Sequence, residues 1–261
     1  MRITVSHDLP LEEELKGPVK VGWFFADGTK APVIYAPPRR VKLRETQRGH
    51  SKSASRCPAI INLESRYFEV LCPVDLHLEF TRDEKGKPHL VNKAGRNSSI
   101  RGQHLGQMVS VTSEPEWRYP DRPTFQLKLP YTLISDEPVY MSQLAPFMHY
   151  AQPPWPGTIF GGRFPIDVWP RPLMWAFEWH DTKLPLRIKR GDPLFYIHFE
   201  PVNPARPVQL VEAELTDDLQ KYLSHISGAV NYVDQTFSLF AQAEQARPDK
   251  LLQEVKRGGR G

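Results

Sequence analysis

The sequence lacks any long apolar run, and no stretch approaches the ~20 consecutive apolar residues that a membrane-spanning helix needs. Its first residues also lack the apolar core of a secretory signal peptide. No P-loop, dinucleotide-binding glycine pattern or Gly-x-Ser-x-Gly element is present. We therefore expect a soluble cytoplasmic protein that has no membrane partner.

Cysteine is scarce, since the chain has only Cys57 and Cys72, each followed by proline. The residues between them read as two strands, and a hairpin turning between Glu64 and Ser65 would place the two cysteines opposite each other. A disulfide is conceivable in that geometry, whereas two reduced, buried thiols are expected in the cytosol. Two cysteines without further ligands at suitable spacing do not make a zinc site.

Proline, by contrast, is abundant, at 26 residues in 261. Proline stops helices and favours turns and strand edges, so this excess predicts many short strands joined by irregular loops. We expect one β-rich domain over residues 1–214, with a long polar loop at 81–106. The clearest expected strands of its first half are Lys20–Phe25, Pro32–Tyr35, Cys57–Asn62, Tyr67–Leu71, Val74–Phe80, Met108–Thr112 and Thr124–Leu129.

Two further strands are expected between residues 161 and 200. Met174–His180 is dominated by aromatic and apolar residues, and Leu194–Phe199 is an apolar run of strand length. Between them lie polar turn residues, including the pair Gly191-Asp192. We expect the two strands to form an antiparallel pair.

Four of the six tryptophans fall between residues 155 and 179. Such a cluster could form a stacking platform for a base or a sugar. Packing in the core is the commoner use of tryptophan, and it is the interpretation that we favour. These tryptophans are Trp155, Trp169, Trp175 and Trp179.

Residues 161–200 contain Ile166-Asp167, then Arg171, and further on the turn Gly191-Asp192 directly before an expected strand. This arrangement resembles the dUTPase and dCTP-deaminase group, which has a β-clip fold, a Gly-x-Ile-Asp segment, an arginine after it and a Gly-Asp turn before a strand. The resemblance covers about forty residues. It implies that Asp167 activates water, with Arg171 beside it and Mg²⁺ as cofactor.

The chain departs from the family at the positions that carry the chemistry. Pro170 replaces the aromatic residue that stacks under the deoxyribose, Pro172 replaces a glycine, and Tyr196 replaces a glutamine. The family's phosphate motif and glycine-rich closing motif are absent from the sequence. A carboxylate without phosphate clamps does not make a pyrophosphatase. We therefore expect a non-catalytic protein and keep catalysis by Asp167 as the alternative.

Residues 39–56 carry seven basic side chains and a single acid, Glu45. The net charge of this segment, +6, exceeds the net charge of +4 of the whole chain. A basic segment rich in small residues could contact phosphates of a nucleic acid or of another phosphate-bearing partner. A solvated loop without a ligand is the other interpretation. The candidate contact residues are Arg39, Arg40, Lys42, Arg44 and Arg48.

A metal site is a second alternative. His77 and Glu79 alternate along one expected strand, and His198 on another strand could complete the two-histidine, one-carboxylate set of a non-haem iron oxygenase. The same alternation is expected of any strand with one solvent-facing side. We therefore expect no metal cofactor.

Residues 215–246 are expected to form one amphipathic helix, which begins near the capping residue Thr216. Apolar residues recur with the 4-3 spacing of a heptad. This seam either packs on the β domain of its own chain or joins two copies in a coiled coil. A short helix and a basic tail should follow over 247–261. The residues of the seam are Leu219, Leu223, Ile226, Val230, Val233, Phe237 and Phe240.

The sequence as a whole predicts a mainly β protein with a β-clip or β-sandwich-like domain and a C-terminal α-helix. The Cys-Pro pair and the Gly-Asp-Pro turn also resemble a group of bacteriophage proteins of unknown activity, and this resemblance implies a phage-encoded, virion-associated protein. We expect a non-catalytic structural or binding protein that forms homo-oligomers.

Overall fold

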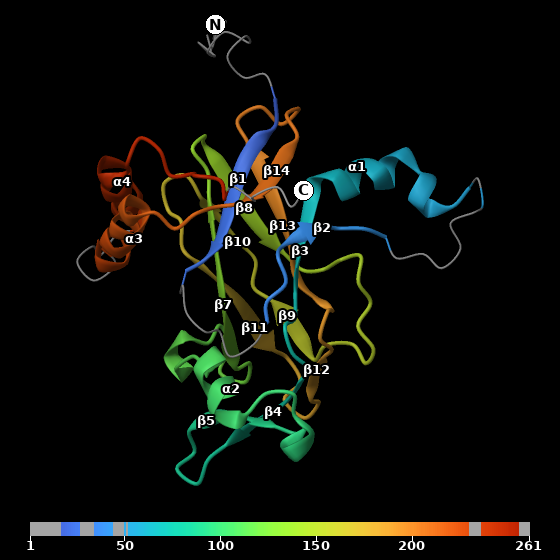
Figure 1. Ribbon diagram of the computed structural model, residues 1–261. Coiled ribbons are helices and arrows are strands. Elements are labelled where there is room, and N and C mark those ends of the chain that lie inside the picture. The colour runs from blue at the N-terminus through green and yellow to red at the C-terminus, as the bar shows by residue number, and fades with distance from the viewer. Residues whose placement is uncertain (1–16, 27–33, 44–49, 51, 230–235, 256–261) are drawn as a thin grey trace, which may run out of the picture.

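The computed structural model describes residues 17–26, 34–43, 50, 52–229 and 236–255. The protein is mainly β, as predicted (Figure 1). Its strands are β1 Val19–Phe25, β2 Arg39–Arg40, β3 Tyr67–Leu71, β4 Leu76–Arg82, β5 Pro88–Asn92, β6 Val109–Val111, β7 Thr124–Ile134, β8 Val139–Leu144, β9 Gly157–Ile159, β10 Gly162–Pro165, β11 Pro172–Trp179, β12 Leu186–Ile188, β13 Pro193–Pro201 and β14 Val208–Glu212.

The helices are fewer and lie around the sheets (Figure 1). Short 3₁₀ turns accompany them at Ala54–Arg56, Gly95–Asn97 and Glu114–Glu116. The α-helices are α1 Pro58–Arg66, α2 Gly102–Met108, α3 Asp217–Ala229 and α4 Thr236–Ala246.

The strands form three sheets. Sheet A has the order β14-β1-β7-β11-β9, with β6 also paired to β7, sheet B has the order β10-β8-β13-β3-β2, and sheet C has the order β12-β4-β5. One apolar core contains buried side chains from all three sheets, including Trp175 of sheet A, Ile197 of sheet B and Leu78 of sheet C. The sheets therefore belong to one folded unit.

The strands predicted at Met174–His180 and Leu194–Phe199 are confirmed as β11 and β13, but the prediction that they pair with each other is wrong. β11 lies between β7 and β9, whereas β13 lies between β8 and β3. Both edges of each strand are thus occupied. The two strands meet through the core instead, where the Trp175 indole donates a hydrogen bond to the Leu194 carbonyl over 3.0 Å.

The tryptophan cluster serves the core, as favoured from the sequence. Trp169, Trp175 and Trp179 are buried, and Trp155 is partly buried with its ring 5.7 Å from that of Trp175. The rings of the cluster are thereby used in packing.

The hairpin predicted between the two cysteines is wrong, because residues 58–66 form α1. Pro58 stands in the first turn, where its missing N–H costs no hydrogen bond, and a short apolar run does not by itself distinguish strand from helix. Cys57 is exposed, Cys72 is buried, and both are free thiols.

Other elements also differ from expectation. The predicted loop 81–106 overlaps the end of β4, the whole of β5 and most of α2, and the short length of these elements hides their periodicity. Ile34 and Tyr35 are not in a strand, while Pro32 lies outside the described residues. Residues 249–255 are not helical, and Glu254 forms a β-bridge with Ala213.

The C-terminal region has two helices where one continuous helix was predicted. Residues 230–235 between them lie outside the described part of the chain. α3 and α4 pack on each other and against β1 and β7, where Leu219 and Ile226 share a buried cluster with Phe24 and Ile134 (Figure 1).

Candidate functional site

Asp167, the predicted catalytic carboxylate, is buried directly after β10. Its Oδ1 accepts a hydrogen bond from the backbone N–H of Val139 over 3.3 Å, and its carbonyl oxygen accepts one from Arg247 Nε over 2.7 Å. Burial raises the pKa of the Asp167 carboxyl above its usual value. Arg171 is exposed, and no interaction joins it to Asp167 within the described residues.

Asp167 belongs to a corner that anchors the C-terminal segment. Asp136 Oδ1 accepts hydrogen bonds from the backbone N–H groups of Leu251 and Leu252 over 2.7 and 2.9 Å. Arg247 donates to the Asp136 carbonyl over 2.8 Å as well as to that of Asp167. These hydrogen bonds join the C-terminal segment to the residues around Asp136 and Asp167. Because Asp167 is buried, its carboxylate has little access to a substrate.

The three residues of the predicted iron site do not come together. His77 and Glu79 lie on β4 of sheet C, whereas His198 lies on β13 of sheet B and stacks on Tyr67 with ring centroids 5.0 Å apart. Within the described ranges, no group of three or more His, Cys, Asp or Glu side chains could hold a metal ion.

Of the five predicted phosphate contacts in residues 39–56, two are engaged within the chain. Arg39 forms a 2.7 Å ion pair with the buried Glu69. Arg40 donates to the carbonyls of Ser65 and Val208 and lies 4.9 Å from the Phe68 ring centroid. Lys42 is exposed, whereas Arg44 and Arg48 lie outside the described residues.

The predicted oligomerisation seam is partly used within the chain. Leu219 and Ile226 are buried against the sheet, while Leu223 and Phe240 are only partly buried. Val230, Val233 and the side chain of Phe237 lie outside the part that the structure describes. The interpretation in which the helix packs on its own β domain therefore holds for Leu219 and Ile226.

Sheet C carries a row of basic side chains that the sequence analysis did not single out. In the antiparallel register Arg187 of β12 stands directly opposite His77 of β4, and the Lys93 N–H binds the His77 carbonyl over 2.8 Å from the other side. These three residues therefore lie side by side on one face of the sheet. The turn after β12 adds the exposed Lys189 and Arg190. We call these five residues the basic face.

The backbone of this turn is held by two carboxylates. Asp75 Oδ1 accepts a hydrogen bond from the Arg190 N–H over 2.8 Å, and Asp192 Oδ2 accepts one from the Lys189 N–H over 3.1 Å. Gly191 takes a φ of 86°, a conformation that favours glycine. The turn is thus fixed while its cationic side chains face solvent.

The electrostatics at His77 reflect these neighbours. Partial burial lowers the pKa of His77, and the charges of Arg187 and Lys93 lower it further, against the opposing effect of Glu79. Glu79 lies on the same face and forms a 2.9 Å ion pair with Lys93, and Asp75 and Asp192 stand at the adjoining turn. The four cations Lys93, Arg187, Lys189 and Arg190 outnumber these three acids, which favours an anionic partner.

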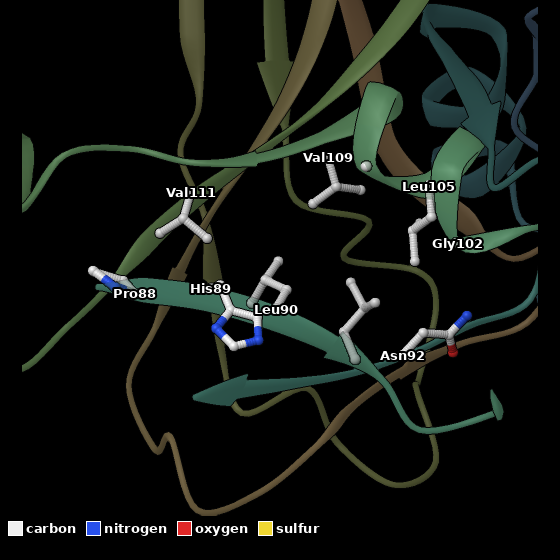
Figure 2. A pocket seen from close by; sticks show the side chains of 10 residues that line it. Pro88, His89, Leu90, Asn92, Gly102, Leu105, Val109 and Val111 are labelled. Carbon is white, nitrogen blue, oxygen red and sulfur yellow. The ribbon is translucent and has the colours of Figure 1, made fainter. Parts of the chain in front are cut away.

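A cavity of about 340 Å³ lies on the other side of the same sheet (Figure 2). Gly102, Gly106, His89 and Asn92 border it together with apolar side chains from four elements. Its volume falls within the range of small-molecule sites. The apolar side chains are Leu78, Pro88, Leu90, Leu105, Val109 and Val111.

A buried carboxylate–imidazole pair lies on sheet A. Glu178 is almost fully buried, and its Oε1 lies 2.9 Å from Nε2 of His180, which is partly exposed. Glu178 Oε2 and the Thr124 hydroxyl, on residues directly opposite in the sheet, have no hydrogen-bond partner among the described residues. Two such atoms side by side are a place for an internal water molecule.

The sequence contained a signal for the basic face that could have been used. All four charged residues between 183 and 190 are basic, and residues 82–101 hold six basic residues against Asp83 and Glu84. The two segments are about ninety residues apart along the chain. Only the β12–β4–β5 pairing shows that they form one surface.

None of the helices in the described part of the chain is long and apolar enough to cross a membrane. No family model matches the chain, and it matches no curated protein and no solved structure.

Proposed function

We propose that the chain is a non-catalytic binding protein that holds nucleic acid on the basic face of sheet C. The row Lys93–His77–Arg187, continued by Lys189 and Arg190, is the observation that carries this function. Exposed lysine and arginine side chains bind the phosphate backbone without regard to sequence and release its counterions.

Two further observations support the proposal. The side chains of Arg187, Lys189 and Arg190 project from a turn whose backbone is already fixed by Asp75 and Asp192, so little order has to be gained on binding. The Asp167 carboxylate is buried and bound to Val139, which favours a structural role for it over the pyrophosphatase alternative.

The proposal is tested by the salt dependence of binding to a labelled single-stranded oligonucleotide. A triple variant with Arg187→Ala, Lys189→Ala and Arg190→Ala should bind more weakly at every salt concentration. Because each lost phosphate contact removes about 0.7 from the slope of log K against log salt for single strands, the slope should fall by about 2. Fluorescence anisotropy between about 50 and 200 mM salt measures both quantities.

A matched control removes the same charge elsewhere. Lys128, Arg171 and Lys250 are exposed cations outside the basic face, and their triple alanine variant should keep the wild-type slope to within about 1 unit. Equal losses in the two triple variants would show a general charge effect. Absence of binding at about 50 mM salt would remove the function altogether.

We also propose that the chain self-associates. Leu223 of α3 and Phe240 of α4 are partly buried apolar residues beside the C-terminal cluster, and among the described side chains they are the seam residues that are not fully buried. Sedimentation equilibrium should show a mass above that of one chain, which Leu223→Gln lowers and the control Leu184→Gln, at a 52% exposed site, does not. A monomer mass for the wild type contradicts this proposal.

The β-clip relationship and a phage origin are further proposals. The Gly191-Asp192 turn directly before β13 and the position of Asp167 after β10 support the first of them. Superposition of a crystal structure of this chain on dUTPases tests it: the strands around Asp167 and Gly191 should align in the same order, and a different strand order rejects it.

A further inference from the structure

Helix α1 packs little against its own chain. None of its nine residues is buried, and the side chain of Ile61 is 51% exposed. In Figure 1 the helix projects from the sheets at the right of the molecule. Isolated helices shorter than about 12 residues are marginal in water, and most helices in proteins are stabilised by the packing of an apolar face. A second surface that covers Ile61 would supply the packing that α1 does not receive within this chain.

The C-terminal end of α1 is fixed on the body of the protein. Arg40 donates a hydrogen bond to the carbonyl of Ser65, which lies in the last turn of the helix. Arg66, the last residue of α1, donates to the carbonyl of Pro204 over 2.7 Å. These bonds hold one end of the helix, while its first turn lies farther from the sheets (Figure 1). The helix is therefore presented to a partner in a fixed direction, so little order has to be gained on binding.

The segment that leads into α1 is basic. Lys52 and Arg56 precede the helix and are exposed. We call residues 52–66 the arm, which contains three basic residues and the single acid Glu64 and therefore carries a net charge of +2. A surface that receives the arm has to offer apolar contact for Ile61 and negative charge for the cations beside it.

The C-terminal helices offer both kinds of contact. Phe240 and Glu244 of α4 are four residues apart and so lie on one side of the helix, where Phe240 is partly buried and Glu244 is exposed. Leu223 of α3 is a second partly buried apolar residue of the same cluster. We call Leu223, Phe240 and Glu244 the receiver. Residues 215–246 contain four acids and one lysine, so the net charge of this region, −3, is opposite in sign to that of the arm.

The arm and the receiver lie on different sides of the molecule. In Figure 1 α1 stands to the right of the sheets, whereas α3 and α4 stand to their left. The arm of one chain is therefore remote from the receiver of the same chain. A contact between two unlike surfaces of identical chains is heterologous, and it continues from copy to copy into a ring or a filament.

We propose that the arm of one chain docks on the receiver of a second copy, with Ile61 against Leu223 and Phe240 and with Arg56 near Glu244. The inference rests on the proposed self-association and adds the two surfaces and their head-to-tail order to it. The desolvated apolar residues carry most of the affinity, while the opposite charges orient the encounter. Because exposed charges are screened by salt, the contact weakens as the salt concentration rises.

The test uses two variants of the full chain, each of which damages one surface. Ile61→Gln removes the apolar contact of the arm and leaves the receiver intact, whereas Leu223→Gln does the reverse. Each substitution should raise the dissociation constant of the assembly by about ten-fold or more in sedimentation equilibrium. The mass of the wild type should pass that of two chains as its concentration is raised, because every added copy presents another arm and another receiver.

A mixture of the two variants gives the sharpest result. At a concentration at which each variant alone is a monomer, an equal mixture should form particles with the mass of two chains. The intact arm of the Leu223→Gln chain binds the intact receiver of the Ile61→Gln chain, and the two damaged surfaces stop further growth. Addition of salt should dissociate these particles.

Matched controls complete the design. Leu184→Gln makes the same kind of substitution as Ile61→Gln at a site that is 52% exposed, and it should keep the wild-type mass. Glu244→Arg should repel the arm and lower the mass, whereas the same reversal at the exposed Glu84 of the β4–β5 turn should not. Thermal unfolding shows whether each variant is folded. Glu244→Arg takes the place of Leu223→Gln in the mixture if the Leu223→Gln protein does not fold.

The outcomes separate this inference from the proposed self-association. A monomeric wild type overturns both. A wild-type mass for Ile61→Gln, together with a lowered mass for Leu223→Gln, overturns the docking of the arm and leaves a contact between the C-terminal helices of two copies. A mixture that stays monomeric, or a wild type whose mass stops at that of two chains, overturns the head-to-tail order and with it the inference.

Discussion

The hydroxyl of Tyr222 lies 3.1 Å from the carbonyl oxygen of Ala243, although 21 residues separate them in the sequence. The same hydroxyl lies 2.7 Å from the carbonyl of Val168, so its single proton is shared by two acceptors. Burial raises the pKa of Tyr222 to about 12, which keeps the group neutral and able to donate at physiological pH. One side chain of α3 thus joins α4 to the β-sheet body.

Removal of this hydroxyl should loosen the C-terminal helices. Tyr222→Phe leaves two buried carbonyls without this donor, so the free energy of unfolding should fall by about 1–2 kcal/mol. Urea denaturation measures the change. Tyr150→Phe, at a 72% exposed site, serves as the control and should stay within about 0.5 kcal/mol of the wild type. Equal effects of the two substitutions would argue against the anchoring role of Tyr222.

Asp167→Asn should separate a structural role from a catalytic one. Burial raises the pKa of Asp167 in the folded state, so the folded protein favours the protonated carboxyl. The contribution of this carboxyl to the free energy of unfolding is therefore favourable below the unfolded pKa of about 3.9, and it is lost as the pH rises through the folded-state pKa. Asparagine does not ionise, so the variant does not lose stability in this way as the pH rises. Its amide oxygen can still accept the hydrogen bond from the Val139 N–H. Its stability relative to wild type should therefore increase from about pH 3 to pH 7.

Urea denaturation at several pH values measures this trend, and Asp121→Asn, at an exposed site, is the control that should show none. Oligonucleotide binding should be unchanged in Asp167→Asn. Release of pyrophosphate from deoxynucleotides by the wild type, lost in the variant, would instead support the enzymatic alternative.

Gly157 is a position where the fold tolerates no side chain. A Cβ atom there would lie 2.0 Å from the Glu178 carbonyl oxygen of the paired strand and 2.8 Å from the Phe177 ring. Gly157→Ala should therefore destabilise the protein by more than about 3 kcal/mol or prevent folding, as overpacking against backbone does. Gly162→Ala, where a Cβ meets nothing within 4 Å, should be nearly neutral in thermal unfolding. A stable, well-folded Gly157→Ala protein would contradict the β9–β11 register.

The sequence predicted strands where aromatic and β-branched residues form uninterrupted runs, as in β3, β11 and β13. It misassigned α1, because Ile60, Ile61 and Leu63 are compatible with either structure when the run is short. It also paired β11 with β13, because neighbours along the chain are the natural first guess. The chain instead passes from sheet A through β12 of sheet C to sheet B, and no local pattern encodes that path.

The candidate site was less accessible to sequence reasoning than the fold. The charge count drew attention to residues 39–56, yet Arg39 and Arg40 are bound to Glu69 and to backbone carbonyls. The basic face joins Lys93 to Arg187 across a sheet register that only the folded structure provides. The cavity depends on glycines of α2, whose significance is visible only once the space beside them is known.

The pKa of His77, followed by NMR with and without a saturating oligonucleotide, tests the central claim most directly, and a His77→Gln spectrum assigns its signal. In the free protein that pKa should lie below the usual value of about 6.5, because of partial burial and the charges of Arg187 and Lys93. Phosphates bound beside these cations should raise it, so that binding takes up a proton and strengthens as the pH falls. An oligonucleotide that binds while leaving the His77 titration unmoved would place the nucleic acid elsewhere and contradict the account.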